Sequence, residues 1–307
     1  MEVPAIFEKV LSLFLMILVG FYGSKKKIIT TSINKGLIDI LIQIALPFMI
    51  LSSFIFTYNE TIKSNVIKTF YYSIAAYIIT IFFSYIILLP IKKNKKTILH
   101  FSNVFVNTGY IGFPVLYSIY GAEGVVYGSI FNTFFVIFLW TYGLFLFKGH
   151  IERKQLKEEL LKIVLNPSII AVCVGLLIMI FNLPIPAPFL SSIKSIGGIT
   201  GPLSMFIIGV ILSNSRLKQY IQDWTLYYGL ATKLIIIPAI ISIFSLFSGD
   251  NSKAIYTIII MSAMPASAMT AIFAESFDKE KEYAAVFVSF STLLSLVTIT
   301  IIIKLIL

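Results

Sequence analysis

Long apolar runs separated by short polar connections dominate this chain of 307 residues. The runs predict ten membrane-spanning segments, because about 20 predominantly apolar residues in a helix cross a bilayer. Their expected ranges are 5–23, 36–57, 67–91, 97–120, 124–147, 167–183, 190–213, 225–248, 253–273 and 283–306. A membrane β-barrel would instead show alternating segments of about ten residues. The pattern therefore predicts an all-α integral membrane protein.

Composition and charge support this class. The chain is 58% hydrophobic and 12% charged, whereas soluble domains are about 45–50% apolar and about 25% charged. The formal charge of +10 does not indicate nucleic-acid binding, because the basic residues follow the membrane topology described next. The single cysteine, Cys173, lies inside an apolar run and excludes a disulfide framework.

The basic residues are distributed unequally between alternate connections. The odd-numbered connections carry 17 lysines and arginines, whereas the even-numbered ones carry Lys63, Lys68 and Lys253, with Lys194 added if the seventh span begins late. Basic residues collect in cytoplasmic loops. We therefore expect a multi-pass protein of the plasma membrane, with odd-numbered loops in the cytoplasm and both termini outside.

The chain is expected to consist of two inverted five-helix repeats, 1–148 and 167–307. Residues 149–166 between them are charged with one apolar side, which predicts a cytoplasmic amphipathic linker. Because five is odd, the two halves must enter the membrane from opposite sides. Prolines in the second and seventh spans, Pro47 and Pro202, lie 155 positions apart, and Pro114 and Pro265 in the fourth and ninth lie 151 apart. Similar offsets favour an internal repeat.

The fourth and ninth spans contain residues that break helices. The fourth includes NVFVNTGYIGFPVLYSIYG (103–121), with an amide, two glycines and a proline in its middle. Simple kinks would explain either break alone, but interrupted helices at matching places in two repeats indicate a transporter's binding site, where half-helix N-termini attract anions. We expect the two breaks to cross. The candidate substrate-binding residues are Asn107, Thr108, Gly109, Gly112, Pro114, Asn132, Pro265, Ala266, Ser267 and Thr270. Asn132, in the fifth span, is expected to face Asn107.

Three further polar residues in predicted spans are candidates for coupling or counter-charge. Asp39 and Gln43 lie one helical turn apart and share a face. Two interpretations of Asp39 stay open. Either it takes part in binding a proton or an ion, or it is a solvated residue near the inner surface of the membrane. Lys233 is either the counter-charge for an anion or a lysine that snorkels to the interface.

Five segments together resemble the auxin efflux carrier family, which includes plant PIN-type auxin exporters and prokaryotic carboxylate permeases. They are ALPFMILSSF (45–54), NTGYIGFPVLYSIYG (107–121), GPLSMFIIGVILS (201–213), SAMPASAMTAIFAESF (262–277) and STLLSLVTI (291–299). The resemblance covers essentially the whole chain. Members of this family are similar in overall fold to bile-acid and sodium/proton transporters.

This resemblance implies a scaffold of spans 1, 2, 6 and 7, with the remaining spans carrying substrate by an elevator-type motion. It places the family's crossover asparagine on Asn107 and its crossover prolines on Pro114 and Pro265. Ala266 and Ser267 stand where relatives often carry other small or polar residues. The long cytoplasmic loop of many plant members is absent, which favours a prokaryotic-type member, so auxin is not assured as the substrate. The resemblance also implies a homodimer, because many family members form dimers.

The leading hypothesis is therefore a secondary transporter of small organic anions, carboxylates in particular, without cofactor or metal. An intramembrane enzyme is disfavoured because the two histidines, His100 and His150, stand unpaired near the cytoplasmic side. A cation/proton antiporter of similar fold is the alternative, although the crossing segments offer amides and hydroxyls rather than a carboxylate. A channel or sensor sharing the fold is the remaining interpretation.

Overall fold

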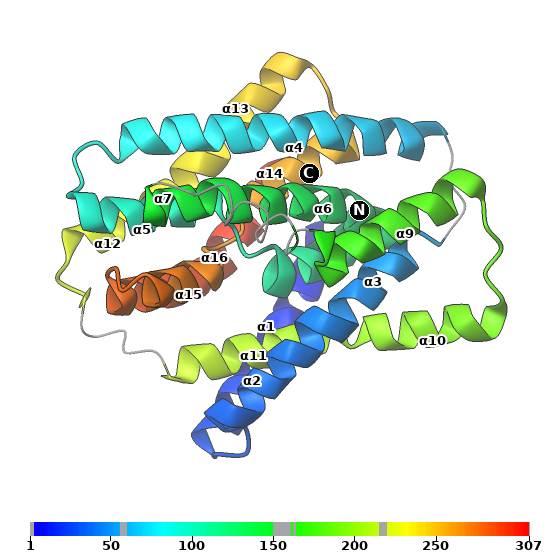
Figure 1. Cartoon of the computed structure of the whole chain (residues 1–307), viewed down its shortest axis with the longest axis horizontal. Coiled ribbons are helices and arrows are strands. Elements are labelled where there is room, and N and C mark those ends of the chain that lie inside the picture. The colour runs from blue at the N-terminus through cyan, green and yellow to red at the C-terminus, as the bar shows by residue number, and fades with distance from the viewer. Residues whose placement is uncertain (1–2, 56–59, 150–160, 162–163, 215–219, 307) are drawn as a thin grey trace.

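Helices account for the regular structure of the described residues (Figure 1). The computed structural model describes residues 3–55, 60–149, 161, 164–214 and 220–306. The helices are α1 (Val3–Lys25), α2 (Thr31–Ile40), α3 (Leu46–Ser53), α4 (Glu60–Ile87), α5 (Lys93–Val104), α6 (Phe113–Phe138), α7 (Leu144–Lys148), α9 (Pro167–Phe181), α10 (Ala187–Gly198), α11 (Thr200–Asn214), α12 (Trp224–Ala231), α13 (Ile237–Ser248), α14 (Lys253–Ser262), α15 (Met269–Ser276) and α16 (Lys281–Ile306). The predicted amphipathic linker falls largely outside the described residues.

Six helical stretches of the described chain are long and apolar enough to cross a membrane. They are Thr31–Ser53, Glu60–Ile87, Thr108–Lys148, Ala187–Ile211, Trp224–Ser248 and Lys281–Ile306. Shorter apolar helices occupy Leu15–Lys25, Pro167–Phe181 and Lys253–Ser262. The prediction of an all-α, multi-pass membrane protein is thus confirmed, while the count of ten spans remains a prediction.

In the part of the chain that the structure describes, π-helical turns lie within or at the start of long helices: η1 (Leu41–Ala45), η2 (Thr108–Gly112), η3 (Leu139–Gly143) and η5 (Thr232–Ile236). After three of them the next helix has a proline at its second position, namely Pro47, Pro114 and Pro238. A proline lacks an N–H group and its ring collides with the carbonyl four residues earlier. A wider turn before the proline relieves that collision, so these prolines bend the helices without ending them.

Gly121 divides the 41-residue stretch Thr108–Lys148. Its backbone angles, φ 64° and ψ −145°, are not helical, although α6 continues on both sides. The sequence pattern predicts the connection between the fourth and fifth spans at this point, between residues 120 and 124. A glycine suits such a turn, because a side chain makes these angles unfavourable.

We expect Gly121→Ala to lower the free energy of unfolding by about 1–3 kcal/mol, the usual cost of backbone strain of this kind. A Cβ atom at Gly121 meets nothing within 4 Å, so strain alone would act. Gly36→Ala is the matched control, since Gly36 lies in helix α2 with equally open surroundings. Alanine there should be neutral or stabilising. Thermal unfolding of both variants in one detergent measures the difference; equal effects would contradict the strain argument.

The helices pack in two groups, which contact each other through α3 and α9 with α6 and through α11 with η2. In the first, α1 packs along α11, and α3 packs against both α9 and α10. Glycines permit this close approach: a Cβ atom on Gly20 would lie 2.3 Å from the Phe206 carbonyl oxygen, and one on Gly197 would lie 2.7 Å from the Met49 Cα. Small residues commonly bring membrane helices together in this way. In the second group, α4 packs against α5, α6 and α14, and α15 packs against α16.

Candidate functional site

The two helix breaks predicted from the sequence meet in the structure. Helix α5 ends at Val104 and helix α14 at Ser262, and the extended residues that follow form an antiparallel bridge between Val106 and Ala266. The Asn107 N–H group donates to the Pro265 carbonyl at 2.8 Å, and the Ser267 N–H group donates to the Phe105 carbonyl at 3.0 Å. The Ala266 N–H group donates to the Ser291 hydroxyl at 3.2 Å. Backbone groups freed by the breaks thus satisfy one another, as an apolar surrounding requires.

A polar side chain caps the helical segment that leaves each break. The Asn107 Oδ1 atom accepts a hydrogen bond from the Tyr110 N–H group at 3.0 Å, at the start of η2. The Ser267 Oγ atom accepts one from the Met269 N–H group at 3.2 Å, at the start of α15. The N-terminal ends of η2 and α15, which carry partial positive charge, therefore both lie next to the bridge.

The structure pairs the breaks differently from the proline offset. The bridge pairs Val106 with Ala266, and on either side of it Asn107 bonds to Pro265 and Ser267 to Phe105. Pro265 lies in the extended part of its break, whereas Pro114 lies in α6, after the π-helical turn. The two prolines that the spacing pairs therefore differ in position, one within its break and one just after it, and their equivalence in a repeat stays a prediction.

Buried amide and hydroxyl groups surround the bridge. Asn132, on α6, accepts a hydrogen bond through Oδ1 from the Thr108 hydroxyl at 2.6 Å, so it contacts the neighbour of Asn107. Asn107, Thr108 and Asn132 are each no more than 6% exposed. The side-chain NH2 groups of Asn107 and Asn132 make no hydrogen bond with other described residues, and the buried Thr270 hydroxyl likewise lacks a described partner. These groups remain available to a ligand.

The two glycines predicted for the site differ in their surroundings. A Cβ atom on Gly112 would lie 2.8 Å from the Met261 sulfur atom, so glycine lets η2 approach α14 closely. A Cβ atom on Gly109 would meet only the Leu46 side chain, at 3.8 Å. Gly112 is thus needed for packing, and Gly109 leaves space on the side of α3.

Asp39 and Gln43 are both exposed, on α2 and η1. Asp39 lies within electrostatic range of Tyr110, a residue of η2, but no hydrogen bond joins the two side chains. Asp39 therefore lies beside the crossing segment without joining its hydrogen-bond network.

Lys233 does not snorkel to an interface. The side chain lies in η5 with 0% exposure, and its Nζ atom donates to the Asn103 carbonyl at 3.3 Å. Asn103 is in the last turn of α5, where helix carbonyls carry partial negative charge. Among the described residues, Lys233 forms no ion pair with a carboxylate. The ammonium group thus lies at the C-terminal end of the first broken helix.

His100 has two hydrogen-bond partners that the sequence did not predict. The ring is 3% exposed; its Nδ1 atom lies 2.8 Å from the Ser84 hydroxyl and its Nε2 atom lies 2.7 Å from the Tyr142 hydroxyl. The expectation of an unpaired histidine was therefore wrong. Ser84 and Tyr142 come from other helical segments, α4 and η3, and no local sequence signal connects them to His100.

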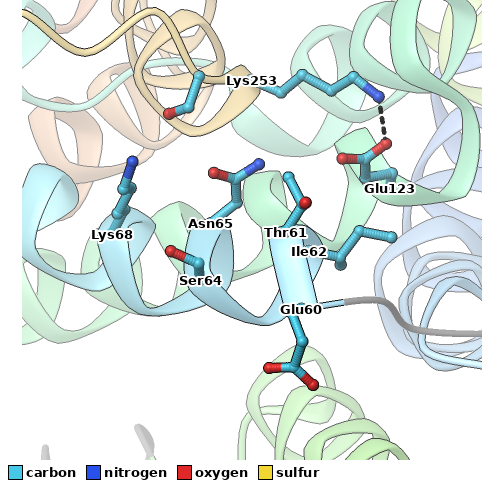
Figure 2. Close-up of a pocket in the computed structure, with 9 residues that line it drawn as sticks. Glu60, Thr61, Ile62, Ser64, Asn65, Lys68, Glu123 and Lys253 are labelled. Atoms are coloured by element: carbon cyan, nitrogen blue, oxygen red, sulfur yellow. Dashed lines mark hydrogen bonds and ion pairs between the residues drawn. The ribbon is translucent and has the colours of Figure 1, made fainter.

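Two pockets lie away from the crossing. One, of about 600 Å³, is formed where α4 and α14 begin and where α6 turns at Gly121 (Figure 2). Asn65 and Thr61 point toward Lys253, which forms an ion pair with Glu123 at 2.5 Å. The other, of about 500 Å³, is lined by residues of three different connections: Pro90, Lys92, Lys95, Asp223, Trp224, Thr225 and Glu280.

Two carboxylates form ion pairs with lysines that line these pockets, Asp250 with Lys68 and Asp223 with Lys95. Burial alone would raise the pKa of Asp250, but hydrogen bonds from Tyr72, Lys68 and Ser252 outweigh it and hold that pKa below its usual value. Burial would likewise raise the pKa of Asp223, and hydrogen bonds from Lys95 and Thr225 lower it instead. Both carboxylates stay charged at neutral pH, and they link neighbouring helices at the ends of the molecule.

No cluster of three or more histidine, cysteine, aspartate or glutamate side chains suited to a metal occurs within the described ranges. Cys173 is exposed on α9.

The family described as "Membrane transport protein" has a sequence model that matches residues 5–303 of this chain. An "uncharacterized transporter" of Methanocaldococcus jannaschii is 24% identical over 311 residues, covering 95% of this chain and 96% of that protein. An "uncharacterized transporter" of Methanothermobacter thermautotrophicus is 28% identical over 198 residues, and the match spans 63% of this chain and 62% of the relative. The chain therefore belongs to the membrane transport protein family, the auxin-efflux-carrier-like membrane transporters.

Proposed function

We propose that this protein is a secondary transporter of small organic anions, carboxylates in particular, and that the anion binds where the two broken helices cross. The observation that carries the proposal is the bridge between Val106 and Ala266, with a capped helix start on each side. Helix N-termini and the amides of Asn107 and Asn132 offer hydrogen-bond donors to a carboxylate. The hydroxyl of Thr270 can add a further one.

Two inverted five-helix repeats would explain how the helices pack. If the first five spans correspond in order to the last five, α1 in the first span corresponds to α9 in the sixth, and α3 in the second span corresponds to α11 in the seventh. The contact of α1 with α11 then corresponds to the contact of α9 with α3, and the structure contains both. Gly20 of α1 and Gly175 of α9 each lie where a Cβ atom would collide with the partner helix, with Phe206 and Phe54 respectively. They are 155 positions apart, the same offset as Pro47 and Pro202. This agreement supports ten spans in two repeats.

The connections support the alternation of spans across the membrane. The larger pocket gathers residues of the second, fourth and eighth connections, and the smaller one gathers residues of the third, seventh and ninth. Even- and odd-numbered connections thus collect separately, as ten alternating spans require. With the basic residues in odd-numbered loops, we place those loops in the cytoplasm and both termini outside.

An elevator-type motion would use the two helix groups as separate bodies. The group of α1, α2, α3, α9, α10 and α11 would be the scaffold, and the group containing both breaks would carry the anion. In the structure the crossing residues are buried, which fits a carrier that shields its site between two exposed states.

A cation/proton antiporter is the second candidate, and Asp39 is the observation that favours it. Its carboxylate acts on Tyr110 of the crossing segment, and acidic residues at membrane depth often bind ions. The side chains of the bridge itself are amides and hydroxyls, so the anion carrier is favoured.

The test is uptake by proteoliposomes of labelled indole-3-acetate, malate and malonate, each with and without sodium and pH gradients. Saturable uptake of at least one anion, above that of protein-free liposomes, is expected. Sodium- or proton-driven cation exchange without uptake of any carboxylate would replace the proposal with the antiporter.

A further inference from the structure

His100 belongs to a chain of hydrogen bonds that joins four helical segments, α4, α5, η3 and η5. The ring contacts Ser84 and Tyr142, and the Ser84 hydroxyl also accepts a hydrogen bond from the Asn103 amide nitrogen at 2.9 Å. The Asn103 carbonyl in turn accepts from Lys233. Tyr142 is partly exposed, whereas Ser84, Asn103 and Lys233 are no more than 1% exposed. The chain therefore leads from a partly exposed hydroxyl into the protein.

A neutral ring satisfies the hydrogen-bond pattern of this conformation. Because the Ser84 oxygen already accepts from Asn103, its own hydrogen is available to the His100 Nδ1 atom, and the Nε2–H group donates to Tyr142. A proton can add to Nδ1 with little movement: the Ser84 hydroxyl rotates and accepts from the ring instead. Hydroxyl partners on both sides thus accommodate either charge state.

The chain also reaches the crossing. A cavity of about 10 Å³, large enough for one water molecule, lies between Asn103 and Val106, the bridge residue. The Asn103 Oδ1 atom and the Tyr77 hydroxyl, both buried, have no hydrogen-bond partner among the described residues and belong to side chains that line this cavity. Rotation of the Ser84 hydroxyl therefore changes a hydrogen bond of Asn103, and Asn103 also bonds to Lys233 and lines the cavity that reaches Val106.

Few charged groups surround the ring. Lys96, on the same helix, lies over the Tyr85 ring at 4.2 Å, and Tyr85 packs edge-on against His100. The titratable side chains near the ring are thus Tyr85 from α4 and Tyr142 from η3, with Lys233 of η5 farther away, beyond Asn103. The segments α7 and α16 contribute Lys148 and Tyr283, which contact Phe277 and Thr225. Helix α15 carries Glu275, whose side chain lies outside the described part of the structure, and no carboxylate among the described side chains pairs with the ring.

We propose that His100 is a proton-binding site and that Ser84 and Asn103 pass its charge state to the crossing, so that the anion and a proton are carried together. This rests on the proposed anion transport. The proton comes from water on one side, adds to the Nδ1 lone pair, and leaves to water on the other side. A single unpaired charge is unfavourable in the protein interior. The proton and the anion are therefore expected to bind together rather than singly. Each ligand favours the binding of the other, because coupling between sites is reciprocal.

The experiment uses proteoliposomes with a pH-sensitive dye inside, given labelled indole-3-acetate, malate and malonate. An acidic exterior should raise accumulation at least tenfold over equal pH, with acidification of the interior. His100→Gln keeps groups that can bond to both hydroxyls but cannot take up a proton. It should lose the gradient-driven accumulation and the acidification, while exchange of labelled for unlabelled anion falls much less. Accumulation and acidification that are unchanged in His100→Gln would overturn the inference.

Direct titration separates this inference from the proposed function. The chain has two histidines, so His150→Gln leaves only the His100 ring in a ¹⁵N-histidine NMR spectrum of the protein in nanodiscs. Proton uptake by that ring between pH 4 and 8, promoted by a carried anion, is the expected result. If none of the three anions is transported, the proposed function fails, but a ring that titrates still supports a proton site. A ring that stays neutral throughout, with and without each anion, overturns it.

Discussion

Replacing Asn107 by aspartate should reduce carboxylate uptake by at least tenfold while leaving the fold intact. The new carboxylate can still accept the hydrogen bond from the Tyr110 N–H group, so the cap of η2 is kept. The substitution removes the NH2 group, which has no partner among the described residues, and places a negative charge where the anion is proposed to bind. Loss of a hydrogen bond to a charged group costs about 1.5–3 kcal/mol, and charge repulsion adds to it.

Asn107→Ala should be equally inactive, but it also removes the cap, at about 1 kcal/mol. Comparing the two variants separates binding from stability. Each is measured by initial uptake per mole of folded protein, with thermal unfolding in detergent recorded in parallel.

Asn166→Asp provides the matched control. Asn166 is also a helix cap, accepting from the N–H groups of Ser168 and Ile169 at the start of α9, which belongs to the other helix group. The same chemical change there should leave uptake at the wild-type level. If Asn107→Asp transports carboxylates as fast as Asn166→Asp, the crossing is not the anion site.

The sequence predicts the helix breaks because their cause is local. Glycine and proline near Asn107 and Pro265 weaken a helix whatever surrounds it. The apolar runs likewise predict the spans, and the turn at Gly121 falls at the expected connection. These features depend on residues that are neighbours in the chain.

Contacts between distant segments could not be predicted in the same way. The pairing of Val106 with Ala266 joins residues 160 positions apart, and the similar but unequal spacing of the prolines does not predict that contact. The partners of His100 lie at positions 84 and 142. For Lys233, a π-helical turn shifts the direction of side chains relative to an ordinary helix, so span position alone did not tell whether the ammonium faces lipid, solvent or protein.

Replacing Lys233 by methionine should raise the apparent Km for carboxylates about tenfold. The ammonium group lies at the end of α5, beside the crossing, with no carboxylate partner among the described residues. At a separation on the order of 10 Å and an effective dielectric constant of about 20, its charge would favour a bound anion by about 1.7 kcal/mol. Methionine has a similar length, and removing a buried charge is often neutral or stabilising for the fold.

Lys194→Met is the control for this change, since Lys194 is an exposed lysine on α10, in the helix group without the breaks. Its apparent Km for the carboxylate should equal that of the wild type. A neutral analogue, indole-3-acetamide tested as a competitor of indole-3-acetate uptake, distinguishes charge from shape: its inhibition constant should be the same with or without the Lys233 ammonium. If the Lys233→Met variant keeps the wild-type Km, or loses affinity for the amide as much as for the acid, Lys233 acts on packing at the end of α5 rather than as the positive charge that favours the anion.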